Sequence, residues 1–316
     1  MQIYIHTLTS ILVLVLLILF VAYLRHRGHL KQESGALFSW LVMQVTLPAL
    51  LFTALAHSAM EWHYLLLFLI MFGAEMILLL TSWGVGRFLK LKSEQMGTFL
   101  IVSTFGSSAL LGYALIAELF PGNSAVLVEA AFVSELGVGL PIFTIGVMIA
   151  IYYGSTDREE ITLLEGILPF FRSPIFLSIV LGILWSTLSL PTQGIVIEPL
   201  FDMIHIIAKS NTFIVALTVG VMLNFSSLRD IIYIIVATII LKLILSPILV
   251  WIPAGFMDLE IWQLQVLILE SAMPSAMLSV VLANRYGCDA KLAAKLVFVT
   301  LFASILTAPM MLKLLA

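Results

Sequence analysis

The chain has 316 residues, of which 62% are hydrophobic and 10% are charged, and its formal net charge is −3. With a mean hydropathy of +1.15, this composition excludes an ordinary water-soluble domain and indicates a polytopic membrane protein. The single cysteine, Cys288, excludes an intrachain disulfide and argues against a thiolate metal cluster. We therefore expect a chain embedded in the lipid bilayer, with no cofactor, no metal site and no nucleic-acid partner.

Apolar runs of about 17 to 25 residues, the length that crosses a hydrocarbon core of about 30 Å, recur along the chain. They predict ten membrane-spanning helices, numbered here as spans one to ten: residues 4–24, 37–56, 64–87, 97–119, 124–152, 174–190, 199–224, 231–255, 262–284 and 291–315. The first run has no basic segment before it and no small-residue cleavage motif after it. We expect it to be a retained span and not a signal peptide.

The basic residues predict the orientation of these spans. Twelve of the fifteen Lys and Arg residues follow odd-numbered spans: Arg25, Arg27, Lys31, Arg87, Lys90, Lys92, Arg158, Arg172, Arg229, Arg285, Lys291 and Lys295. Because cytoplasmic loops carry the excess of Lys and Arg, both termini are predicted on the non-cytoplasmic side of the plasma membrane. No soluble domain fits between the spans, and 154–173 is predicted as a cytoplasmic connection.

A faint internal repeat relates the two sides of this connection. Gly122 and Gly287 lie in short loops 165 residues apart, and Pro141 and Pro309 lie 168 residues apart in the spans that follow those loops. Since each half holds an odd number of spans, the second half must insert upside down. The repeat predicts two inverted five-helix units, residues 1–153 and 174–316, although Gly and Pro are common enough in membrane helices for chance to produce the spacing.

Span nine contains a proline and a carboxylate, Pro274 and Glu270, within an otherwise apolar run. Proline removes a backbone donor and clashes with the carbonyl four residues earlier, so the helix is predicted to break there. Such a break is tolerated in a membrane only where the freed groups are buried in protein or line a watery cavity. Transporters use broken helices of this kind to hold a solute.

Span four carries the counterpart of this break, the run from 103 to 112, STFGSSALLG. Gly106 and Gly112 loosen the helix, and Ser107 and Ser108 offer hydroxyl groups. Small residues at this spacing also serve as contacts between packed helices. The position opposite Pro274 favours a solute-binding segment, to which we assign Gly106, Ser107, Ser108, Gly112, Pro274 and Ser275, with Lys209 of span seven as a further contact.

Five ionisable residues lie deep within predicted spans: Glu75, Glu135, Lys209, Lys242 and Glu270. Each would cost about 2.5 to 3.5 kcal/mol at the centre of a lipid-facing helix, so they must face one another, water or a ligand. Alternatively, these acidic and basic side chains pair with one another only to hold the helices together. A carboxylate held away from water favours its protonated form, so we assign Glu75, Glu270 and Glu135 to proton coupling and Lys242 to the counter-charge. Glu118 and Glu129, nearer the outer ends, are expected to be solvated.

The chain resembles the auxin efflux carrier family of secondary transporters, whose bacterial members include permeases for malate- and malonate-like acids. The resemblance rests on VTLPALLF at 45–52, FGSSALLG at 105–112, ALTVGVML at 216–223, Lys242 with Pro247, and AMPSA at 272–276 followed by NRYG. It implies two five-helix inverted repeats, unwound and crossing spans four and nine, and a scaffold of spans one, two, six and seven. It also implies a homodimer, an anion held at the crossing, and an acidic residue linked to transport at the position of Glu75.

One departure from the family pattern concerns the solute. Ser107 stands where many relatives have an asparagine, and Tyr113 and Ala114 stand where they have a proline. A serine hydroxyl can donate one hydrogen bond to a carboxylate, whereas an asparagine side chain can donate two. The solute contacts therefore differ from the family pattern, and auxin itself is not the expected solute.

These observations predict an all-α polytopic membrane protein of ten helices, a carrier and not an enzyme. The expected function is secondary transport of a small organic anion, a mono- or dicarboxylate, by alternating access with a coupling proton or sodium ion. A sodium/proton antiporter-like carrier is the first alternative, but no aspartate lies deep in a span. A non-transporting sensor with a transporter fold is the second. No HExxH motif, P-loop or Ser/His pair at depth indicates an intramembrane enzyme.

Overall fold

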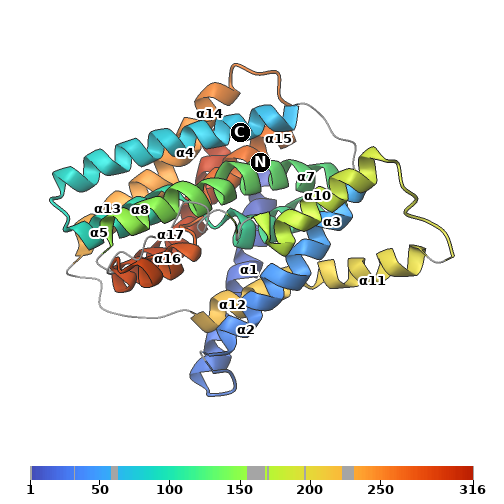
Figure 1. The fold of residues 1–316 in the computed structure, drawn as a ribbon, viewed down its shortest axis with the longest axis horizontal. Coiled ribbons are helices and arrows are strands. Elements are labelled where there is room, and N and C mark those ends of the chain that lie inside the picture. The colour runs from blue at the N-terminus through green and yellow to red at the C-terminus, as the bar shows by residue number, and fades with distance from the viewer. Residues whose placement is uncertain are drawn as a thin grey trace. The chain divides into compact units, whose positions relative to one another are not determined.

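The computed structural model describes residues 2–31, 33–57, 63–154, 168, 171–195, 197–222 and 231–315, and these residues form helices and no strand (Figure 1). Contacts group the chain into two compact units. Unit one comprises Met1–Tyr64, Tyr113–Ala131 and Phe171–Leu223. Unit two comprises Leu65–Gly112, Phe132–Phe170 and Asn224–Ala316. Neither unit corresponds to one half of the sequence, and the predicted repeat boundaries at 153 and 174 stay a prediction.

Unit one contains spans one, two, six and seven, the set that the family resemblance implies as a scaffold. Its helices are α1 (Gln2–His26), α2 (Ser34–Leu41), the π-helical segment η1 (Val42–Thr46), α3 (Leu47–Ala56), α6 (Tyr113–Leu119), α7 (Ser124–Ala131), α10 (Pro174–Thr187), α11 (Ile197–Lys209) and α12 (Asn211–Met222). Helix α12 packs on α1 and α2, and α3 packs on α7, α10 and α11. Figure 1 shows α2 and α12 side by side.

Unit two contains spans three, eight, nine and ten, the part of span four up to Gly112, the part of span five from Phe132, and one large buried apolar cluster. Its elements are α4 (His63–Phe88), α5 (Ser93–Thr104), η2 (Ser108–Gly112), η3 (Phe132–Gly139), η4 (Ile142–Gly146), α8 (Val147–Tyr153), α13 (Ile232–Ile239), η6 (Ile240–Leu245), α14 (Ser246–Ala254), α15 (Ile261–Ser271), α16 (Leu278–Tyr286) and α17 (Ala290–Leu315). In Figure 1 the last two, coloured red, lie side by side after a short turn.

Helix α4 shows why unit two belongs in a membrane. Leu67, Met71 and Leu78 recur at helical spacing and are fully buried on one face. The outward face is also apolar, with Leu69 and Leu80 exposed. A helix that is apolar all round is either buried in a large core or surrounded by lipid, and the exposed leucines favour lipid.

Six helices in the described part of the chain are long and apolar enough to cross a membrane: Ser34–Ala56, His63–Phe88, Ser124–Tyr153, Ile197–Val221, Ile232–Ala254 and Ala290–Leu315. They coincide with predicted spans two, three, five, seven, eight and ten. Three shorter apolar helices, Val15–His26, Ser108–Leu119 and Pro174–Thr187, overlap spans one, four and six. The polytopic all-helical class is confirmed, whereas the total of ten spans stays a prediction.

Prolines inside three of these helices coincide with π-helical segments. Pro48, Pro141 and Pro247 follow η1, η3 and η6, and in each case the carbonyl four residues earlier lies inside the π-helical segment. Proline has no N–H to donate to the carbonyl four residues earlier, and its ring clashes with that carbonyl. A wider, π-helical turn relieves the clash without ending the helix. These helices therefore remain continuous, in contrast with spans four and nine.

Candidate functional site

The helix of span four is interrupted at Gly106. Helix α5 ends at Thr104, Phe105 adopts an extended conformation (φ −87°, ψ 130°), and helical structure resumes at Ser108. A side chain at position 106 would approach within 3.1 Å of the Nζ and Cε atoms of Lys242. Glycine therefore lets the lysine side chain lie directly against the backbone of the break.

The helix of span nine is interrupted at the predicted proline. Helix α15 ends at Ser271 and α16 begins at Leu278, which leaves residues 272–277 outside helical structure. The backbone N–H of Ser275, freed by the break, donates to Oγ1 of Thr300 on α17 at 3.2 Å. The predicted break at Pro274 is confirmed, and unit two satisfies this freed group with a hydroxyl.

The two interruptions pair with one another within unit two. Gly106 and Ser275 form an isolated antiparallel bridge. The N–H of Ser107 donates to the carbonyl of Pro274 at 2.6 Å, and the N–H of Ala276 donates to the carbonyl of Phe105 at 2.9 Å. Non-helical backbone is tolerated in a membrane only where its polar groups are buried in protein or face water. The pairing meets that requirement, and we call the two interruptions together with Lys242 the break site.

Lys242 supplies a buried cation to the break site. Its side chain is 0% exposed, and its ammonium donates to the carbonyl of Ser271 at 3.1 Å and to Oγ of Ser246 at 3.4 Å. The carbonyl of Ser271 belongs to the last turn of α15, so the lysine sits at the negative end of that helix. The cation thus contacts both interruptions, through Gly106 on one side and Ser271 on the other.

Two buried carboxylates lie near this cation. Glu75 on α4 and Glu270 on α15 are 1% and 0% exposed, and the charges of both interact with that of Lys242. No described group donates a hydrogen bond to either carboxylate. A buried ionised carboxylate without hydrogen bonds is strongly unfavourable, so both groups are suited to exchange a proton or to receive a cation.

A third carboxylate, Glu135 on η3, is buried and interacts with Glu270 as a like charge. Gly112 makes room for Glu270, because a Cβ at this glycine would lie 2.8 Å from Oε1 of the carboxylate. The hydroxyls of Ser134 and Ser108 join η3 to η2 through a 2.8 Å hydrogen bond. Ser275 adds a buried hydroxyl that has no hydrogen-bond partner among the described residues.

Most of the residues predicted from the sequence therefore meet in unit two. They are Gly106, Ser107, Ser108, Gly112, Pro274 and Ser275 from the two interruptions, and Glu75, Glu135, Lys242 and Glu270 from the charged set. Their assigned roles stay predictions. Lys209 belongs to unit one, at the end of α11, and does not share their unit. The expected solvation of Glu129 is wrong, because α7 packs against α3 and α6 and buries this side chain completely, whereas Glu118 is exposed.

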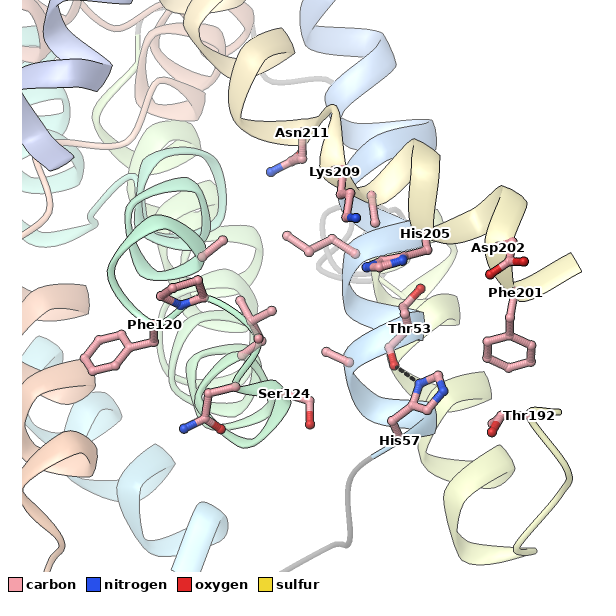
Figure 2. A pocket seen from close by; sticks show the side chains of 18 of the residues that line it. Thr53, His57, Phe120, Ser124, Thr192, Phe201, Asp202, His205, Lys209 and Asn211 are labelled. Carbon is pink, nitrogen blue, oxygen red and sulfur yellow. Dashed lines mark hydrogen bonds between the residues drawn. The ribbon is translucent and has the colours of Figure 1, made fainter. Parts of the chain in front are cut away.

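Unit one contains a separate cavity of about 620 Å³, which we call the α11 pocket. Figure 2 shows Thr53 of α3, His57 just after that helix, Phe120 just after α6 and Ser124 at the start of α7 around it, with Asp202, His205 and Lys209 of α11. Sequence reasoning identified only Lys209 of this group. The missed signal is the spacing of Glu198, Asp202, His205 and Lys209, which places one polar side chain on each successive turn of a single helix face.

Chemically, the break site combines one cation, two helix starts, hydroxyl groups and carboxylates in a solvent-poor location. Segments η2 and α16 begin at Ser108 and Leu278, immediately after the paired interruptions. The first amides of a helix lack intrahelical acceptors and favour an anion, but at the start of α16 those of Ser279 and Val280 already donate to the carbonyls of Ala276 and Met277, so η2 is the better candidate. Within the described ranges, no cluster of His, Cys, Asp and Glu has the arrangement of a metal site.

Comparison with known proteins finds similarity to membrane transporters along nearly the whole chain. A family model described as "Membrane transport protein" matches residues 6–161 and 160–312. "Uncharacterized transporter MJ1031" of Methanocaldococcus jannaschii is 23% identical over 303 residues, which cover 94% of this chain and 95% of that protein. "Uncharacterized transporter" of Methanothermobacter thermautotrophicus is 25% identical over 313 residues, 96% of each chain. "Uncharacterized transporter YfdV" of Escherichia coli K12 is 22% identical over 291 residues, 90% of each chain.

Proposed function

Because the chain belongs to the membrane transport protein family, the auxin efflux carrier family of the sequence resemblance, we propose that it is a secondary active carrier of a small organic anion. The solute is a mono- or dicarboxylate, and it binds at the break site. Movement across the membrane follows alternating access, in which the break site opens to one side at a time.

The position of Lys242 is the observation that carries this proposal. A fully buried ammonium lies against Gly106 and donates to the carbonyl of Ser271, so it touches both interrupted helices. The start of η2 adds backbone donors next to the same point. Donors and positive charge gathered in a low-dielectric site favour a carboxylate over a neutral solute.

The buried carboxylates support coupling to protons. Glu75 and Glu270 have no hydrogen-bond donor among the described residues, and both interact with the Lys242 charge. When a solute carboxylate occupies the ammonium, these groups lose part of their stabilising counter-charge, which favours proton uptake. Glu135 reinforces this tendency as a like charge near Glu270. In this account proton and solute binding promote one another.

In this proposal the two halves of the chain are inverted repeats, and spans four and nine cross one another. Gly122 and Gly287, the paired loop positions, adopt nearly the same left-handed conformation, with φ of 77° and 76°. Pro48 and the junction between α11 and α12 occur at matching places in spans two and seven, where Thr46 donates to Asn211, 165 residues away. In the proposed orientation both termini face the non-cytoplasmic side of the plasma membrane, and the carrier is a homodimer.

Counterflow in proteoliposomes tests the function. Vesicles containing the purified protein and unlabelled malate, malonate or acetate should accumulate the matching labelled solute, more strongly at the lower of two pH values. A proton gradient should drive net uptake, whereas a dependence on a sodium gradient alone would favour the antiporter-like alternative. Loss of counterflow in both Ser107→Ala and Pro274→Ala, with normal folded protein in the membrane, supports binding at the break site. Normal uptake by both variants would remove that assignment.

A further inference from the structure

The α11 pocket lies wholly within unit one and is lined by a polar stripe on one helix face. Glu198, Asp202, His205 and Lys209 line it from successive turns of α11, and Figure 2 shows the last three in succession along one wall. The opposite face of α11 is apolar, with Leu200 48% and Met203 52% exposed. In a membrane protein, ionisable side chains turned away from the apolar face mark a water-filled cavity or a solute pathway.

Asn211 gives this pocket a hydrogen-bond donor with no protein acceptor. The side chain is 1% exposed, its Oδ1 accepts a hydrogen bond from the hydroxyl of Thr46 at 2.8 Å, and it lines the pocket. Its Nδ2 has no partner in the part of the chain that the structure describes. Because native proteins pair nearly all buried donors, an unpaired amide facing a cavity indicates a place for an acceptor atom of a ligand.

Lys209 lies two residues before this amide and brings a positive charge to the same end of the pocket. It ends α11, whereas Asn211 begins α12, with Ser210 alone between the two helices. Figure 2 shows both side chains near the junction of the two helices. An ammonium and an unpaired carboxamide N–H are both donors, and together they suit a carboxylate.

The remaining charged side chains of the pocket are acidic. Glu198 and Asp202 line it from the first turns of α11, and Glu118 lines it from α6. Asp202 is the nearer acidic residue of α11, seven residues or about 10 Å before Lys209, and acts on a molecule bound there through its charge. Ionised carboxylates accept hydrogen bonds and repel a second negative charge. The wall of the pocket beside Asp202 therefore favours a hydroxyl or an ammonium group.

We propose that the α11 pocket is a second binding site, specific for a small monocarboxylate whose other end donates hydrogen bonds. The carboxylate binds Lys209 and the Nδ2 of Asn211, and the donating end, the hydroxyl of a hydroxy acid or the ammonium of an amino acid, points along α11 towards His205 and Asp202. The site is distinct from the break site, because every residue that lines it belongs to unit one. Its existence does not depend on the transport proposal, since binding is measured without transport.

Equilibrium dialysis of the detergent-purified protein with radiolabelled lactate and alanine tests the site. Saturable binding of at least one probe is expected, and the stronger of the two identifies hydroxyl or ammonium as the preferred end. Acetate, which lacks a donating end, and malonate, which carries a second carboxylate, should compete at least about tenfold more weakly. Absence of saturable binding by both probes, or tighter competition by malonate than by either probe, would overturn the proposal.

Substitutions locate the binding. Lys209→Gln and Asn211→Leu should each weaken it by about 10- to 100-fold, because each removes a donor to a charged group. Lys31→Gln and Asn284→Leu, at exposed positions, are the matched controls. Lys209 is itself exposed, so its variant tests the site even if Asn211→Leu does not fold. Binding that survives in Lys242→Gln and is lost in Lys209→Gln belongs to the pocket, whereas the reverse pattern assigns it to the break site and contradicts the proposal.

Discussion

The break site and the α11 pocket handle charge in opposite ways. In the break site Lys242, Glu75 and Glu270 are almost completely buried, and the cation is held by backbone carbonyl and hydroxyl groups. In the α11 pocket Lys209 and Asp202 are exposed along a continuous helix. Burial strengthens each electrostatic interaction, so the charges of the break site can influence one another strongly. The exposed charges of the α11 pocket are screened by water and salt, and they act mainly by favouring one kind of ligand over another.

The difference explains why only one region needs broken helices. A continuous helix uses its own carbonyls as acceptors and has none to offer to a buried cation except at its end. Ending α15 at Ser271 and pairing the next residues with Phe105–Ser107 provides such a carbonyl to Lys242. The α11 pocket has its own helix junction at Ser210, but there the lysine remains exposed.

Removal of the buried cation should produce the largest effect. Lys242→Gln leaves Glu75 and Glu270 without their counter-charge and removes the proposed charged partner of the solute. Breaking a buried charge pair costs about 3 to 5 kcal/mol, which corresponds to a loss of transport of at least about 100-fold. Counterflow in proteoliposomes measures it. Lys291→Gln, at an exposed position in unit two, should transport normally. Near-normal counterflow by the Lys242 variant would place the solute elsewhere.

Neutralising Glu75 should separate proton coupling from solute binding. In Glu75→Gln the amide cannot exchange a proton, so uptake driven by a proton gradient should be lost while pH-independent counterflow persists. Glu94→Gln, on the exposed first turn of α5, is the control. If Glu75→Gln left proton-driven uptake intact, Glu270 or Glu135 would have to carry the proton in its place.

Gly112→Ala should have an intermediate effect. The added Cβ would lie 2.8 Å from Oε1 of Glu270, so the carboxylate or the η2 backbone must shift. Overpacking costs about 1 to 3 kcal/mol, or roughly 5- to 150-fold in apparent affinity if the strain falls on the solute-bound state. Gly84→Ala adds the same methyl where no atom lies within 4 Å and should be silent. Partial recovery in Gly112→Ala with Glu270→Asp would confirm the contact as the cause.

The smallest expected effect on transport comes from the hydrogen-bonded hydroxyls of Ser134 and Ser108. Ser134→Ala removes the 2.8 Å hydrogen bond that its hydroxyl donates to Ser108, worth about 0.5 to 1.5 kcal/mol. A change of about 2- to 12-fold in the half-saturating solute concentration is expected, with little change in the amount of folded protein. An effect as large as that of Lys242→Gln would mean that Ser134 contacts the solute directly.

Local signals predicted the break site better than the pocket. A proline and deep charges are costly in a membrane helix wherever they occur, so Pro274, Glu75 and Lys242 could be identified one residue at a time. The bridge between Gly106 and Ser275 depends on segments far apart in sequence, and only the repeat spacing indicated it. The α11 pocket was missed because a polar stripe such as Asp202, His205 and Lys209 is also typical of a solvated helix face. The hydrogen bond between Thr46 and Asn211 has no local signal at all.

Accessibility of Ser275 tests the central claim most directly. In a Cys288→Ser background, Ser275→Cys is treated with a membrane-impermeant anionic methanethiosulfonate in oriented vesicles, with and without malonate, alongside Ser178→Cys as a buried control in α10. A solute pathway through the break site predicts labelling of the thiol at position 275 from one side of the membrane, slowed by malonate, and no labelling at position 178. Complete protection of both positions under conditions of active counterflow would contradict it.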